Sequence, residues 1–180
     1  MKLGVYIGSF NPVHIGHISI VNYLLDNGIV DKVLIVPTVG YWDKTNMVDI
    51  KDRINMLKFF ETESILVDSI HNDISYTYEL MRKLKKEYDS ELHLIIGADN
   101  LISFDKWKNY EELLTYKIIV MNRDNISIDS LTSKYNTPNF IVLNDFPLVD
   151  VSSTKIRENI SEEYLDKRVY QYIKDNNLYK

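Results

Sequence analysis

The sequence predicts an α/β fold built on a doubly wound parallel sheet, Rossmann-like in layout, and two observations carry this prediction. Short apolar runs rich in Val and Ile recur along the chain, and amphipathic segments with helical spacing lie between several of them. This alternation is typical of βαβ units, whose strands are buried on both faces of a parallel sheet. The predicted strands are residues 3–7, 32–36, 64–67, 92–96, 117–121 and 140–143.

The first connecting helix is predicted over residues 15–26. It ends at Asn27-Gly28, a common signal for a helix C-terminus. Its core-facing side is expected to consist of Ile18, Val21, Leu24 and Leu25.

Two further helices are predicted, over 49–60 and 77–88. The first of them directs its apolar side chains toward the core, whereas Lys51, Asp52 and Arg53 lie on its wetter side. The second ends in a cluster of charged residues, 83–87, which we interpret as a solvated face. Residues 122–138 are expected to form a looser polar connection. The predicted core residues of the helix over 49–60 are Ile50, Ile54, Met56 and Leu57.

The composition is that of an ordinary folded domain. The 180 residues are 45% hydrophobic and 26% charged, which excludes a disordered chain and fits one domain over 1–180. The absence of cysteine excludes disulfides, thiolate metal sites and a cysteine nucleophile. A formal net charge of -5 argues against non-specific nucleic-acid binding, which needs a basic surface. With neither a signal-type apolar start nor a run that could span a bilayer, we expect a cytoplasmic protein with no membrane partner.

The loop after the first strand, Gly8-Ser9-Phe10-Asn11-Pro12-Val13-His14-Ile15-Gly16-His17, has the features of a phosphate-binding site. Ligands of doubly wound sheets bind outside the carboxyl ends of the strands, where Gly8 lets backbone N–H groups approach an anion. His14 and His17 lie three residues apart at the start of a helix, whose N-terminus carries partial positive charge. The alternatives are structural histidines, or half of a metal site, for which the two other histidines lack matching spacing.

This loop resembles the G-x-F-x-P-x-H-x-G-H signature of the nucleotidyltransferase superfamily. The resemblance implies a Rossmann-like nucleotidyltransferase fold in which Gly8, Ser9 and Phe10 belong to an ATP site. It also implies that His14 and His17 bind the ATP phosphates and stabilise charge while the α-phosphorus is attacked and pyrophosphate leaves.

A second candidate phosphate site is Asp150-Val151-Ser152-Ser153-Thr154-Lys155-Ile156-Arg157, which opens a helical pattern. One hydroxyl could simply cap an ordinary surface helix. Three hydroxyls and two basic residues, one of them an arginine able to bind bidentately, offer a cluster of phosphate donors. The segment resembles the I-S-S-T-x-I-R signature of the same superfamily, with valine in place of isoleucine. The resemblance implies ATP contacts from Ser152, Ser153, Thr154 and Arg157.

A third segment, residues 95–107, joins a strand end to an acid and an aromatic side chain. Gly97 suits close approach, Asp99 can accept hydrogen bonds from a ribose or a base, and Trp107 can either stack on a ring or lie in the core. The segment resembles the G-x-D and downstream W element of nicotinate- and nicotinamide-mononucleotide adenylyltransferases. That resemblance implies that Gly97 and Asp99 bind ATP and that Trp107 stacks on the pyridine ring.

Three other segments bear on this resemblance. Ser75-Tyr76-Thr77 resembles the family's S-Y-T element, which lines the pyridine-nucleotide site, and residues 169–179 resemble the ending of bacterial members. The loop over 37–44 departs from the pattern, because bacterial members carry P-P-H-K there. Only Pro37 and Lys44 match it in character.

The departure in this loop affects the acceptor substrate. By resemblance, Lys44 binds phosphate and lies with Asn11 in the pyridine-nucleotide site; the alternative is a solvated lysine in the Gly40–Lys44 loop. The sequence of this loop resembles the eukaryotic-type branch of the family more closely, and that branch accepts nicotinamide as well as nicotinate mononucleotide.

The resemblance therefore implies an adenylyltransferase of NAD biosynthesis. The phosphate of nicotinate or nicotinamide mononucleotide attacks the α-phosphorus of ATP, which needs positioning and charge stabilisation rather than a general base. Mg²⁺ is expected as the ion bound through the ATP phosphates, not at a metal site of the protein. The expected catalytic side chains are His14, His17, Lys44 and Arg157.

Two rival functions are compatible with the first signature alone. One is a transferase for another phosphorylated acceptor, such as phosphopantetheine, and the elements at Asp99 and Trp107 argue against it. The other is a non-catalytic nucleotide sensor. Replacement of a signature histidine or of Arg157 would favour a sensor, but the signature histidines and Arg157 are all present. The resemblance leaves a homo-oligomer open, because many members of the family self-associate.

Overall fold

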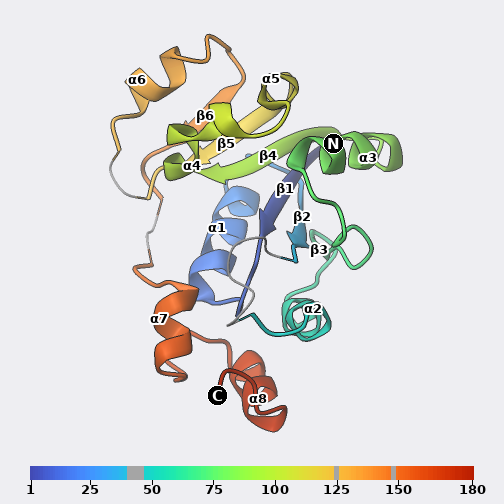
Figure 1. Ribbon diagram of the computed structural model, residues 1–180, viewed down its shortest axis with the longest axis vertical. Coiled ribbons are helices and arrows are strands. Elements are labelled where there is room, and N and C mark those ends of the chain that lie inside the picture. The colour runs from blue at the N-terminus through green and yellow to red at the C-terminus, as the bar shows by residue number, and fades with distance from the viewer. Residues whose placement is uncertain (40–46, 124–125, 147–148) are drawn as a thin grey trace.

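The computed structural model describes residues 1–39, 47–123, 126–146 and 149–180. Within them, six strands form one parallel sheet in the order β3-β2-β1-β4-β5-β6 (Figure 1). Every predicted strand is confirmed, with ends that shift by at most one residue. The strands are β1 (Lys2–Gly8), β2 (Lys32–Pro37), β3 (Ile65–Val67), β4 (Glu91–Gly97), β5 (Lys117–Met121) and β6 (Phe140–Leu143).

Helices cover both faces of this sheet. One apolar cluster packs α1, α2, α7 and α8 against one face, and a second packs α3, α4, α5 and α6 against the other (Figure 1). No helix in the described ranges has the length and apolar character of a membrane span. The helices are α1 (Ile15–Asp26), α2 (Ile50–Lys58), α3 (Thr77–Glu87), α4 (Ala98–Ile102), the 3-10 helix η1 (Phe104–Lys106), α5 (Tyr110–Leu113), α6 (Ile128–Ser133), α7 (Ser153–Glu158) and α8 (Lys167–Asp175).

The strands are apolar on both sides because both sides are covered. In β2, Leu34 and Val36 belong to the cluster under α3, whereas Val33 and Ile35 belong to the cluster under α1. This two-residue alternation between two cores is what the near-continuous apolar runs of the sequence indicate. The doubly wound parallel sheet is confirmed.

The strand order reverses beside β1. The chain builds β2 and β3 on one side of β1 and then crosses to β4 on the other side, where Tyr6 pairs with Ile95. Ligands of such sheets bind at the carboxyl ends of the strands at this switch point. Gly8 and Gly97 end the two strands that flank it.

Local predictions differ from the structure in four places. In α2 the predicted core residue Ile50 is only half-buried and belongs to neither apolar cluster. The segment over 122–138 contains α6, whose six residues bury one apolar side chain, Ile128, and are too few to show a helical period. Arg53 is 2% exposed instead of lying on the wetter side of α2. In α1 the fully buried positions are Ile20, Val21 and Leu24, and the expected Ile18 and Leu25 pack only partly against that core.

Candidate active site

His14 and His17 together cap the N-terminus of α1. His14 is the N-cap, and its Nδ1 atom accepts hydrogen bonds from the backbone N–H groups of Gly16 (3.1 Å) and His17 (3.4 Å). In return, Nδ1 of His17 accepts one from the backbone N–H of His14 (3.1 Å). This is a capping box in which two imidazoles replace the usual hydroxyl and carboxylate side chains. Both rings are therefore held in fixed orientations.

The capping bonds also define the protonation of the two rings. Since Nδ1 of each accepts a hydrogen bond, the proton of each neutral ring lies on Nε2. Burial, together with the charge of Arg123, lowers the pKa of His14 to about 4. Burial, then the charges of His14 and Arg123, lower the pKa of His17 well below its usual value. Near pH 7 the site therefore contains two neutral imidazoles, each with an Nε2–H donor.

The glycine between the two histidines is required by close packing. A Cβ atom on Gly16 would lie 2.9 Å from Cε1 of His14 and 3.0 Å from Cγ1 of Val151. Both distances are shorter than normal carbon–carbon contacts, so any side chain here would displace the capping imidazole. Val151 belongs to the second signature, and Gly16 is thus a point where the two signatures pack together.

The second signature is bonded directly to the first. Ser152 is the N-cap of α7, and Oγ of Ser153 donates to the carbonyl of Pro12 at 2.9 Å across 141 positions of sequence. The guanidinium of Arg157 donates through Nη1 to the carbonyl of Asn11 at 2.8 Å. The predicted phosphate-binding residues from the two ends of the chain therefore form one site.

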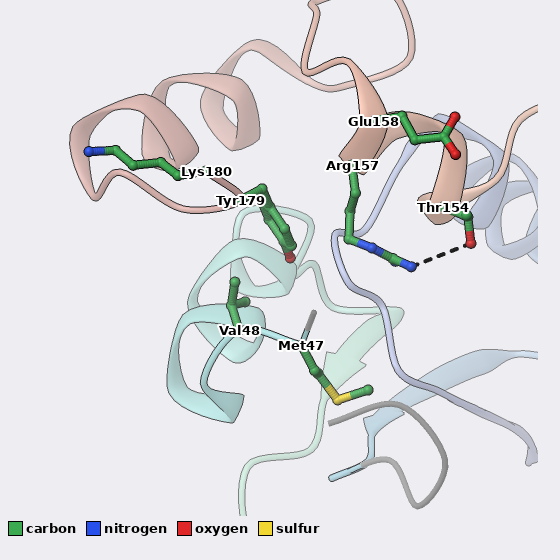
Figure 2. A pocket seen from close by; sticks show the side chains of 7 residues that line it. All are labelled: Met47, Val48, Thr154, Arg157, Glu158, Tyr179 and Lys180. Atoms are coloured by element: carbon green, nitrogen blue, oxygen red, sulfur yellow. Dashed lines mark hydrogen bonds between the residues drawn. The ribbon is translucent and has the colours of Figure 1, made fainter. Parts of the chain in front are cut away.

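A cavity of about 410 Å³ opens beside Arg157. Figure 2 shows the guanidinium of Arg157 and the ring of Tyr179 both directed into it, with Arg157 also bonded to the hydroxyl of Thr154 at 3.4 Å. Lys180 and Glu158 also line this cavity, but their charged groups point away from Arg157 (Figure 2). The lining residues are Met47, Val48, Thr154, Arg157, Glu158, Tyr179 and Lys180.

A second cavity, of about 290 Å³, lies at the carboxyl ends of β1, β4 and β5. It brings together Thr77, Gly97, Asp99 and Trp107, which the sequence analysis assigned to nucleotide binding. Gly97 lies so close to Asp99 that a Cβ atom would collide with its carboxylate.

Not all of the predicted pyridine-site residues line this cavity. Ser75 and Tyr76 are exposed and absent from the cavity wall, and Lys108 lies 4.6 Å above the ring of Tyr76. Trp107 is half-buried and packs on Phe104, with 5.0 Å between the ring centroids, so it takes part in the core as well as in the cavity. Lys44, with the Gly40–Lys44 loop, lies outside the described residues.

Two arginines of the site were not among the sequence predictions. The buried Arg53 donates through Nη1 to the carbonyls of Ser9 (2.8 Å) and Thr38 (2.6 Å), and through Nε to that of Val48 (3.1 Å). Arg123 follows β5 and lines the smaller cavity. The rule that ligands bind at strand ends could have identified Arg123. No sequence signal separates Arg53 from its charged neighbours on α2.

Comparisons with known proteins identify the family and the fold. The cytidylyltransferase-like family model matches residues 5–159. A Fusobacterium nucleatum protein described as a "probable nicotinate-nucleotide adenylyltransferase" is 37% identical and covers 91% of this chain and 89% of its own. A Flavobacterium psychrophilum protein with the same description is 32% identical over 100% of both chains.

Among solved structures, the Plasmodium falciparum nicotinic acid mononucleotide adenylyltransferase complexed with NaAD has a TM-score of 0.82 at 21% identity. It aligns with 99% of this chain and 97% of its own, which confirms the fold. The match of the family model over most of the chain and the full-length identity to the bacterial relatives establish the family. The chain belongs to the cytidylyltransferase-like family and, within it, to the nicotinate-nucleotide adenylyltransferases.

Proposed function

We propose that the protein transfers the adenylyl group of ATP to nicotinate mononucleotide, with release of pyrophosphate, as a step of NAD biosynthesis. The observation that carries this proposal is the bonding of the second signature to the first. Ser153 and Arg157 both donate to carbonyls of the histidine loop, at Pro12 and Asn11. These bonds hold the guanidinium of Arg157 next to the loop that carries the two imidazoles, and this supports binding of a triphosphate between the two signatures.

The chemistry that these groups support is an in-line transfer. The phosphate of the mononucleotide is already an anion, so it can attack the α-phosphorus without a base, and pyrophosphate leaves. The Nε2–H groups of His14 and His17 would donate to phosphate oxygens, and Arg157 would bind the leaving pyrophosphate. We also assign Lys44 to the phosphates. An anion beside the imidazoles raises their pKa values, so they can become cationic as charge builds up.

Mg²⁺ is proposed to enter with ATP. This hard cation prefers oxygen ligands, whereas the side chains placed at the site are chiefly nitrogen donors, which suit phosphate oxygens. Within the described ranges no three His, Asp or Glu side chains are grouped to hold a metal. We propose that the ion is held by the triphosphate, where it would neutralise part of the phosphate charge.

The side of the second cavity formed by Thr77 and Trp107 is the proposed site of the mononucleotide, and Gly97 and Asp99 of the same cavity stay assigned to ATP. Thr77 and Trp107 line it together, and Trp107 offers a half-buried ring on which a pyridine can stack. The names of the bacterial relatives specify the acid rather than the amide, which supports nicotinate mononucleotide as the preferred acceptor. Acceptance of the amide, toward which the loop over 37–44 leans, stays a prediction.

A single assay distinguishes the rival functions. The protein is incubated with MgATP and one of three acceptors, nicotinate mononucleotide, nicotinamide mononucleotide or phosphopantetheine, and pyrophosphate release is measured. We expect the highest kcat/KM with nicotinate mononucleotide. Release with phosphopantetheine alone would replace the proposed acceptor, and binding of ATP without release in any arm would indicate a sensor.

A further inference from the structure

The segment after α8 folds back onto the histidine loop. Helix α8 ends in a Schellman motif: Asn177 has a left-handed φ of 53°, and the N–H of Leu178 donates to the carbonyl of Ile173 at 3.0 Å. Tyr179 then adopts a second left-handed conformation, with φ of 58°. This conformation is unfavourable for an aromatic residue, so tertiary contacts must hold it.

The contact that holds Tyr179 is a hydrogen bond to the first signature. Its hydroxyl donates to Oδ1 of Asn11 at 2.6 Å, across 168 positions of sequence. The same oxygen accepts the backbone N–H of Val48 at 3.3 Å. Burial raises the pKa of the Tyr179 hydroxyl above its usual value, which keeps it a neutral donor at physiological pH. Asn11 itself is 3% exposed.

Asn11 is thus held from two sides. Tyr179 bonds its side chain, and Nη1 of Arg157 bonds its main-chain carbonyl at 2.8 Å. Tyr179 and Arg157 also line the same cavity, with the guanidinium of Arg157 turned toward Thr154 (Figure 2). Because the side chain and the carbonyl belong to the same residue, a shift of the Asn11 main chain after loss of the Tyr179 bond would also move the carbonyl to which Arg157 is anchored.

We propose that Tyr179 is a positioning residue for triphosphate binding, which acts by fixing Asn11 and, through it, the guanidinium of Arg157. This inference rests on the proposed function, since it assumes that Arg157 faces the phosphates of ATP. Tyr179 needs no contact with the nucleotide. Its role is to keep the arginine in the orientation in which both of its terminal nitrogens can be used.

The test is the affinity for the α,β-methylene analogue of ATP with Mg²⁺, in which the bond that the reaction breaks is blocked, measured by titration calorimetry. Tyr179→Phe removes only the hydroxyl, and loss of one hydrogen bond in a positioning network is expected to weaken binding by roughly 3- to 10-fold. In the steady state, we expect the KM for ATP to rise by a similar factor, while the KM for the mononucleotide changes less than about twofold. Unchanged affinity in Tyr179→Phe would overturn the proposal.

Tyr172→Phe is the matched control. Like that of Tyr179, the hydroxyl of Tyr172 makes long-range hydrogen bonds: it donates to Asp52 of α2 at 2.7 Å and accepts from Asn55 at 3.0 Å. Tyr172 does not line the cavity beside Arg157. This variant is expected to lose stability and to bind the analogue as the wild type does. If both variants bound the analogue equally weakly, the cause would be a general effect of changes in the C-terminal segment. This result would also overturn the proposal.

A double-mutant cycle tests whether Tyr179 acts through Arg157. In an Arg157→Ala background, Tyr179→Phe should change the affinity by less than about twofold, because the group it positions is gone. Additive losses would contradict this mechanism. These experiments measure binding and do not depend on turnover. If the protein made no dinucleotide, the proposed function would be wrong, but the binding result could still be interpreted.

Discussion

The imidazole of His14 stacks on that of His17, with 3.7 Å between the ring centroids and 22° between the ring planes. Each ring accepts a backbone N–H from the other residue, so the pair is fixed by the helix terminus that it caps. Two cations at this separation would repel each other, and burial keeps both rings neutral before the nucleotide arrives. The pair is thus prepared to gain charge when a phosphate binds.

The neutral histidine pair predicts that the free energy of unfolding falls below about pH 6.5. Together with the opposite trend expected from His71, this gives a maximum near pH 6.5. The folded pKa of His14 is about 4, below the unfolded value near 6.5, so the unfolded state binds the proton first as the pH falls. Stability is therefore lost from about pH 6.5 down to about 4, by up to roughly 3 kcal/mol for His14. Urea unfolding between pH 5 and pH 8 measures this limb. His14→Asn keeps a capping side chain and should make this limb shallower, while the part due to His17 stays; an unchanged slope in that variant would contradict the assignment.

His71 determines how the free energy of unfolding changes above pH 6.5. Burial opposes its charge, but hydrogen bonds to Asp68 (2.5 Å) and Glu87 (2.9 Å) raise the pKa of His71 above its usual value. Its contribution is complete below the unfolded pKa and is lost as the pH rises through the folded one. His71→Gln should remove the decline of stability above pH 6.5 and leave the acid limb as in the wild type. A decline that persists in this variant would have another cause.

Gly16→Ala is expected to lower kcat by roughly 10-fold or more, because the added methyl group displaces the capping ring of His14. It should also cost about 1–3 kcal/mol of stability, although alanine ordinarily favours a helix. Gly28→Ala is the control: Gly28 has φ of 64° and open space around it, so strain lowers stability by about 1 kcal/mol while activity stays normal. Normal turnover by Gly16→Ala would show that the ring can move without consequence.

Arg53→Met should lower the free energy of unfolding by roughly 2–4 kcal/mol, since three main-chain carbonyls lose a buried charged donor. Arg168 provides the comparison, because it donates to the carbonyl of Phe59 at 2.6 Å from an exposed position. Arg168→Met should change stability by less than about 1 kcal/mol. Urea unfolding of both variants checks the difference, and equal losses would show that Arg53 has no special role in holding the histidine loop.

Much of the fold follows from sequence pattern, because buried parallel strands are apolar on both faces and leave continuous runs such as Lys117–Met121. The histidine loop was equally visible, since glycine and two spaced histidines directly follow a strand. Pattern does not show which distant groups meet. The bond from Ser153 to Pro12 and that from Tyr179 to Asn11 depend on how α7 and α8 pack, and no local period encodes them.

The burial of charged and polar side chains was the least predictable property. Arg53 directly follows two other charged residues, Lys51 and Asp52, and a helical pattern assigns it to solvent. It is buried because three carbonyls surround its guanidinium, which is a tertiary fact. The neutral state of His14 and His17 is likewise set by the packing around them and not by their spacing.

The most direct test of the central claim is transfer of the α-phosphate label of ATP to nicotinate mononucleotide, followed in the wild type and in His17→Gln. Glutamine is a usual partner at the third position of a capping box, so this variant should keep the helix terminus and lose only the imidazole. We predict labelled dinucleotide from the wild type and a rate at least roughly 100-fold lower from His17→Gln, with an unchanged melting temperature. Absence of labelled dinucleotide from the wild type, or near-normal transfer by His17→Gln, would contradict the account.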